Sequence, residues 1–183
     1  MRRRNYLRVL GSLPFVAAGV SGCLSGRMNG PAERALTADA IGEAWTYSDG
    51  GSPVVTESGT ITASYHADEP YPQTVRLRLW PCEGETLDAL GGTCSLGNLP
   101  DQMRANESVT TADGSIGETA FLWWTGTVTD IEVVTANHVF RLTHTALSGT
   151  DSAADPEIPP QDDRIETVTR IAQLQTDKID RLT

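Results

Sequence analysis

Apolar and polar residues alternate through the middle of the chain, from about residue 40 to residue 150. Within Thr74–Trp80 every second residue is apolar and two of the residues between them are arginine, and Thr60–His66 alternates in the same way. A period of two is typical of a β-strand with one buried face. Similar short patterns occur at residues 121–125, 131–133 and 140–144.

Segments rich in glycine, proline, Asn and Asp separate these patterns and predict turns. They are residues 49–51, 57–59, 69–72, 113–114 and 136–137. About six to eight short strands, with a turn roughly every dozen residues, favour a mainly antiparallel β-sandwich, Ig-like in its general architecture. We therefore expect residues 40–150 to form a β-sandwich domain.

The end of the chain changes from strand to helix periodicity. Residues 151–163 are rich in proline and acidic residues and predict an extended linker. Residues 164–183 predict a short amphipathic helix, capped by Asp162 or Asp163. Its apolar positions follow three-four spacing: Ile165, Val168, Ala172, Ile179 and Leu182.

Gln175 lies on the apolar side of this predicted helix. A free coiled coil of under three heptads would be marginal. We therefore expect the helix to pack either on the sandwich or on a protein partner, and the pattern favours neither.

The first 23 residues carry the most specific motifs in the chain. The hexapeptide Arg3-Arg4-Asn5-Tyr6-Leu7-Arg8 resembles the twin-arginine export motif. The apolar stretch 9–20 is too short to cross about 30 Å of hydrocarbon and has the length of a signal-peptide core. Val20-Ser21-Gly22-Cys23 then resembles a lipobox, in which cleavage precedes a cysteine that takes a thioether-linked lipid.

On these residues the chain resembles haloarchaeal lipoproteins exported by the twin-arginine pathway. The resemblance implies that residues 1–22 are removed, that Cys23 carries the lipid and that residues 23–39 form a tether. It also implies a location on the outer face of the cell membrane, held by the lipid on Cys23. It covers no part of the domain that follows.

The charge of the chain fits an extracellular, halophilic setting. The net charge is −10, and removal of the four arginines in residues 1–22 takes it to −14. Such a surface repels nucleic acid, which we therefore exclude as a partner. The basic residues are 13 arginines and one lysine, Lys178, a composition that also resembles haloarchaeal proteins.

Cys82 and Cys94 remain as a pair once Cys23 is assigned to the lipid. In an oxidising exterior an even pair predicts a disulfide. A metal or redox site is the alternative, but there is no CxxC motif and no histidine between the two cysteines.

Candidate residues for chemistry are few. The histidines His66, His138 and His144 show no metal-binding spacing, and no nucleotide-binding or hydrolase motif occurs. We predict no metal and no cofactor. Adjacent Trp123 and Trp124 should point to opposite faces of a strand. Asn106 begins an Asn-Glu-Ser sequon for N-glycosylation.

These observations favour a non-enzymatic binding or interaction module on the cell surface. The 164–183 helix is the expected contact for a protein partner. The alternative is a solute- or metal-binding accessory lipoprotein of a transporter or redox system, with exposed aromatic residues or the three histidines as ligands.

Overall fold

The computed structural model of the protein describes residues 30–48, 51–82, 94–146 and 159–183. The predicted export motif at Arg3 and Arg4, the lipidation site Cys23, part of the 49–51 turn and most of the acidic linker lie outside the described residues. Predictions for those segments therefore stay predictions.

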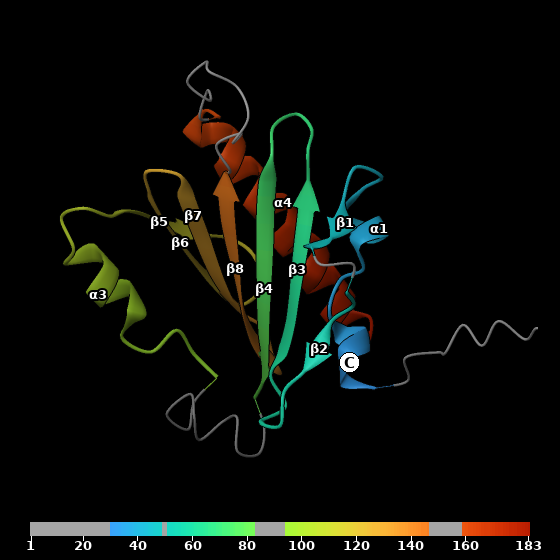
Figure 1. Cartoon of the computed structure of the whole chain (residues 1–183). Helices are drawn as coiled ribbons and strands as arrows, with labels where there is room; N and C mark the ends of the chain where they lie inside the picture. Colours follow the sequence, from blue (N-terminus) through green and yellow to red (C-terminus); the bar gives the residue numbers. More distant parts are fainter. Residues whose placement is uncertain (1–29, 49–50, 83–93, 147–158) are drawn as a thin grey trace, which may run out of the picture.

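The strands of the described chain form one antiparallel sheet (Figure 1). Its order is β1-β3-β4-β8-β7-β6-β5, and β2 also pairs with β3. The strands are β1 (Thr46–Tyr47), β2 (Val54–Val55), β3 (Ile61–Ala67), β4 (Gln73–Pro81), β5 (Thr110–Gly114), β6 (Thr119–Thr125), β7 (Val128–Val134) and β8 (His138–Ala146).

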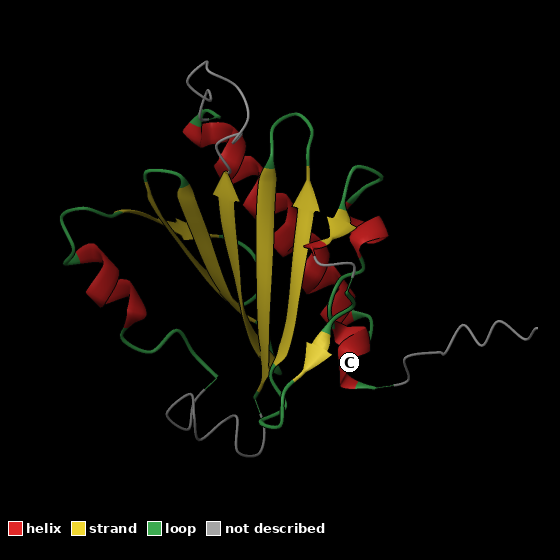
Figure 2. Ribbon diagram, in the orientation of Figure 1, coloured by secondary structure: helices red, strands yellow, loops and turns green. Residues whose placement is uncertain are grey.

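A long C-terminal helix, α4 (Gln161–Asp180), runs diagonally across one face of the sheet (Figure 2). The 3-10 helix η1 (Pro31–Arg34) and the short helix α1 (Ala38–Ile41) lie at the β1–β3 end of the sheet (Figure 1). A second short helix, α3 (Leu99–Arg104), lies at the opposite, β5 end. We call the side of the sheet away from α4 the open face.

The core fills the space between the sheet and α4. On this side a row of apolar residues crosses the strands from Ala63 through Leu77, Leu142 and Ile131 to Leu122. Buried side chains of α4 pack over this side: Val168, Ile171, Ala172 and Ile179. The period-two pattern of the strands and the three-four pattern of the helix therefore meet in one core.

The structure confirms a mainly antiparallel β fold with a C-terminal amphipathic helix. The sandwich is not confirmed, because the described strands belong to a single sheet and α4 covers its apolar face. The tail helix thus packs on its own domain, one of the two expected alternatives.

Three local boundaries differ from the sequence-based predictions. Asp113 and Gly114 are the end of β5 rather than a turn; the turn follows, with Gly117 at φ +62°. Pro160 precedes the first turn of α4, so Asp162 and Asp163 lie inside the helix rather than at its cap, and α4 starts within the predicted linker.

The packed domain also begins before residue 40. Leu36 and Ala38, assigned to the tether, are 2% and 5% exposed. The fully buried Gln175 of α4 holds this segment: its Oε1 accepts from the Leu36 amide at 3.0 Å and its Nε2 donates to the Arg34 carbonyl at 2.6 Å. The Tyr65 hydroxyl donates to the Leu36 carbonyl at 2.9 Å.

Within the described segments, no helix combines the length and the apolar character needed to cross a membrane.

Candidate functional site

Arginines gather in the middle of the open face. Arg78 of β4 lies directly opposite Arg141 of β8, and Arg76 lies opposite Thr143 in the next row. Placing like charges opposite each other in a sheet is unfavourable by itself. The register of β4 and β8 therefore concentrates positive charge in a domain that is otherwise strongly acidic.

These arginines differ in how they are paired. Arg141 Nε and Nη2 both contact Glu132 Oε2, at 2.7 and 2.6 Å. Arg76 and Arg78 are exposed, and among the described residues no carboxylate oxygen lies within 4.0 Å of either guanidinium. Each guanidinium offers five N–H donors in a planar fork that suits oxyanions.

A groove of about 450 Å³ lies beside Arg76 and Arg78. Its cause is an interruption at the sheet edge: β1 pairs with residues 65–66 of β3 and β2 with residues 61–62, so Ala63 and Ser64 pair with no strand on this side. The described residues that line the groove are Tyr47, Ser48, Gly51, Ser52, Val54, Thr62, Ala63, Ser64, Arg76 and Arg78.

A second hollow of about 170 Å³ adjoins this groove. It is lined by Arg76, Arg78, Arg141 and Thr143, so the two spaces share two arginines. We call the two hollows together the arginine groove. Among the described residues that line it there are hydroxyls and guanidiniums but no carboxylate, histidine or cysteine.

The β6–β7 side of the open face is closed by aromatic and acidic residues. Phe121 and Trp123 stack at 5.9 Å, with Arg104 of α3 over the first ring and Arg141 over the second, each at 5.1 Å. Burial raises the pKa of Asp130 and of Glu132, and the positive charge of Arg141 partly offsets both shifts. Positive charge is therefore accessible on the β3–β4 side of the face.

The predicted histidine ligands lie apart. His138 and His144 are at opposite ends of the buried side of β8, about 20 Å apart at 3.3 Å per residue, and His66 is on the open face, bonded to Asp68 at 2.9 Å. Of the residues that the structure describes, no three His, Cys, Asp or Glu side chains are grouped so as to hold a metal ion.

His144 has a structural environment. It is fully buried, its Nε2 lies 3.0 Å from Gln73 Oε1, and Tyr71 packs edge-on at 6.3 Å. Burial lowers the pKa of His144 to about 4, and the nearby charge of Arg164 acts in the same direction. The ring is therefore neutral near pH 7.

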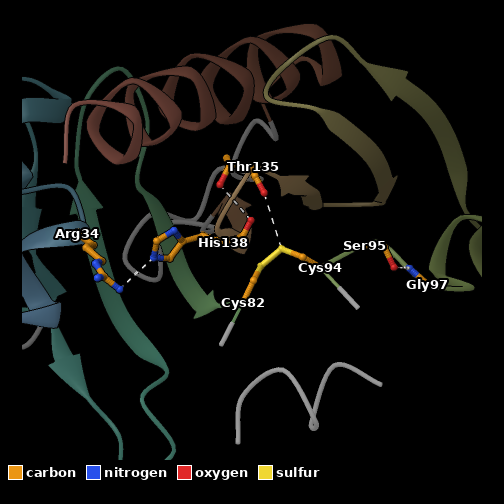
Figure 3. The surroundings of a disulfide bond; sticks show 7 residues. All are labelled: Arg34, Cys82, Cys94, Ser95, Gly97, Thr135 and His138. Atoms are coloured by element: carbon orange, nitrogen blue, oxygen red, sulfur yellow. Dashed lines mark hydrogen bonds between the residues drawn. A yellow bond between two sulfur atoms is a disulfide. The ribbon is translucent and has the colours of Figure 1, made fainter. Parts of the chain in front are cut away.

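The predicted disulfide is present. Cys82, next after β4, is joined to Cys94 with a Cα–Cα distance of 5.4 Å (Figure 3). The Cys82 amide donates to the Asn137 carbonyl at 2.8 Å, and Cys94 Sγ lies 3.7 Å from the Thr135 carbonyl oxygen. The bond therefore ties the segment leading to α3 to the end of β4 and to the β7–β8 turn.

The remaining candidates are placed as follows. Asn106 is exposed after α3, and its Oδ1 accepts from the Ser108 amide and hydroxyl at 3.1 and 2.7 Å. Trp123 and Trp124 point to opposite faces, as predicted, and both are largely covered: Trp123 on the open face and Trp124 against the core. Neither is an exposed ligand contact.

No protein-family model matches the chain, no curated protein matches it in sequence, and no solved structure matches its fold.

The sequence does not reveal the arginine groove. Arg76 and Arg78 appear there as the polar half of an alternating strand, which is ordinary for solvent-facing positions. The sequence contains one signal. The chain has 24 acidic residues, yet residues 74–80 contain two arginines and no acidic residue to neutralise them.

Proposed function

We propose that the protein is a lipid-anchored binding module on the outer face of the cell membrane, not an enzyme, and that the arginine groove binds an anionic ligand. We infer an anionic ligand from one observation, the pair Arg76 and Arg78. Both are exposed beside a hydroxyl-lined groove and lack a carboxylate partner among the described residues. Charge-assisted bonds from guanidinium to carboxylate or phosphate would offset their mutual repulsion.

The hydroxyl groups indicate a polar ligand rather than an apolar one. Ser48, Ser52, Thr62 and Ser64 line the groove beside the apolar Val54 and Ala63, and each hydroxyl can donate and accept. A ligand that carries both carboxylate or phosphate groups and hydroxyls suits this lining best.

Ligand binding is tested by NMR, following the Nε–Hε signals of Arg76 and Arg78. Tripolyphosphate and trigalacturonate are the anionic probes, and maltotriose is the neutral control. We expect saturable shifts with an anionic probe, and at least a 10-fold loss of affinity in Arg76→Gln/Arg78→Gln. Arg104→Gln is the matched control, because Arg104 is already paired with Asp113 at 2.6 Å.

Equal loss in the two variants, or no shift with either anion, would contradict a specific groove. Titrations at 0.1 M and 2 M salt separate a fitted site from diffuse attraction, since the Debye length falls from about 10 Å at 0.1 M to about 3 Å at 1 M.

The anchor is tested by intact-mass analysis of protein purified from membranes. Loss of residues 1–22 together with a lipid adduct on Cys23 is expected, and Cys23→Ser should release the protein from the membrane fraction. A chain that still begins at Met1, or a free thiol at Cys23, would refute anchoring.

The alternative, an accessory lipoprotein that delivers a small solute to a transporter, would use the same groove. It is favoured if a single small acid such as galacturonate binds as tightly as its trimer. A metal-binding form has no support in the described residues, where the three histidines lie apart.

A further inference from the structure

The exposed large apolar side chains of the described residues gather at one end of the domain. They are Val54, Val55 and Leu182, with exposed fractions of 60%, 38% and 53%. The first two form β2, which contacts η1, and Leu182 follows the end of α4. Elsewhere the described surface has no exposed side chain of this kind.

Leu182 lines an apolar hollow at this end, together with Pro53, which directly precedes β2. Its volume is about 300 Å³, and four of its described lining residues are Ala32, Ala35, Pro53 and Leu182. Lys178 also lines it, but the Lys178 Nζ donates to the Ala35 carbonyl at 2.6 Å and is therefore held against η1. Clustered exposed apolar surface on a small domain marks a contact with an apolar partner.

The chain enters the domain at this same end. Gly30 precedes η1, and Cys23 is seven residues earlier. Fully extended, that connection reaches at most about 25 Å. A folded domain of about 150 residues has a radius of gyration of about 15 Å and so a diameter of roughly 40 Å. A lipid on Cys23 cannot reach around such a domain.

We propose that this end, made of η1, β2 and the last turn of α4 with Leu182, rests on the bilayer that holds the lipid. The proposal depends on the anchoring of Cys23 proposed above. The short connection brings this end to the membrane, and its apolar side chains then contribute contacts at the lipid interface. In η1 and residues 177–182 three acidic and three basic residues balance, whereas the whole chain carries −10, so this end repels anionic headgroups less than the rest of the domain.

This orientation is tested by depth-dependent quenching in the lipidated protein. Leu182→Cys carries a bimane label at the proposed contact, and Thr125→Cys carries it at the other end of the sheet. The strand register places Thr125 in one row across the sheet with Val128, Thr145, Thr74 and His66. In contrast, β2 pairs with residues 61–62, at the other end of β3. The proteins are reconstituted in phosphatidylglycerol–phosphatidylcholine vesicles that contain lipid with a doxyl group at acyl carbon 5.

We expect doxyl lipid to quench the label at residue 182 at least threefold more strongly than the label at residue 125. Equal quenching at both sites, in protein that floats with the vesicles, would overturn the orientation and leave anchoring intact. A label at residue 182 shielded from both doxyl lipid and aqueous iodide would indicate a protein or a second copy on this surface and would overturn it too. Failure of the protein to float would refute the anchoring itself.

Discussion

At the scale of single residues, a buried polar side chain joins the segment 34–36 to the C-terminal helix α4. Gln175 interrupts the apolar side of α4. Its side-chain oxygen accepts a hydrogen bond from the Leu36 amide, and its side-chain nitrogen donates one to the Arg34 carbonyl. Buried amide and carbonyl groups are costly when unpaired, so this side chain replaces water for two backbone groups at once.

Replacing Gln175 with leucine should lower the free energy of unfolding by about 2–4 kcal/mol, because the Leu36 amide and the Arg34 carbonyl would lose their partner. Urea unfolding followed by circular dichroism measures the change. Gln173→Leu is the matched control: Gln173 is on the same helix but exposed, and its side chain donates to the exposed Asp177 at 2.7 Å instead of to a buried backbone group. Equal effects in the two variants would show that the two bonds from Gln175 to Leu36 and Arg34, which we call the Gln175 clamp, do not stabilise the fold.

His144 makes stability depend on pH. Its pKa is lowered from 6.5 to about 4 in the folded state, so the unfolded chain takes up a proton first as the pH falls. The folded state should therefore lose up to about 3 kcal/mol between pH 6.5 and pH 4. Unfolding free energies across this range should decline less steeply in His144→Gln than in the wild type.

Two carboxyls act in the opposite direction. The pKa values of Asp130 and Glu132 are raised, so the folded state binds protons before the unfolded state and gains stability as the pH falls. The difference between wild type and His144→Gln isolates the histidine. His66→Gln, which removes a histidine from the open face, serves as control, and an identical pH profile for all three proteins would rule out the role given to His144.

At the scale of elements, the disulfide holds the segment that carries α3. It joins the end of β4 to residue 94 and closes a loop with a sequence separation of 12. Beyond it, α3 is attached to the sheet by Arg104, which bonds Asp113 and lies over Phe121. The central strands do not need this bond, since β4 and β8 pair along their whole length.

Replacing both Cys82 and Cys94 with serine should lower the free energy of unfolding by about 3 kcal/mol, as expected for a loop of this size. Hydrogen exchange should increase mainly in residues 94–109, with the β4 and β8 amides still protected. Reduced wild-type protein should behave in the same way. The prediction is wrong if reduction does not lower stability. It is also wrong if the β4 amides lose as much protection from exchange as residues 94–109.

The sequence predicted the longer elements, which are β3, β4, β6, β7, β8 and α4, but not the short ones and not what covers the sheet. Alternation identified β3, β4 and β8 to within one or two residues, because each has one strictly buried face. The same alternation fits a second sheet or a helix as the covering layer, and the choice of α4 over a sandwich partner depends on contacts distant in the chain. The role of Gln175 also depends on a distant contact. In the sequence it is a polar residue on the apolar side of a helix, and only the folded structure shows that it bonds the segment 34–36.

The arginine groove could not be predicted for the same reason. It needs Arg78 opposite Arg141, which are far apart in sequence, and it needs the gap between β1 and β2 at the edge of β3. Strand register and edge pairing are properties of the assembled sheet, so no local pattern contains them.

At the scale of the whole molecule, net charge opposes folding in dilute salt. The mature chain would carry −14, and this self-repulsion weakens as salt shortens the Debye length. Between 0.1 M and 2 M NaCl we expect a gain of about 2 kcal/mol, or roughly 4–8 °C in the unfolding midpoint. Thermal unfolding in glycine betaine of equal osmolality is the control, because a zwitterion does not screen charge. An equal gain in both solutes would rule out screening.

The Gln175 clamp has a consequence for the order of folding. Leu36 and Gln175 are 139 residues apart, so this contact cannot form until residue 175 has left the ribosome. Before then the sheet can assemble, but the segment that follows the proposed lipid attachment site has no α4 to bind. A chain truncated before residue 175 would keep its hairpins but leave the backbone of residues 34–36 without this partner, so this part of the domain is completed only after α4 has been synthesised.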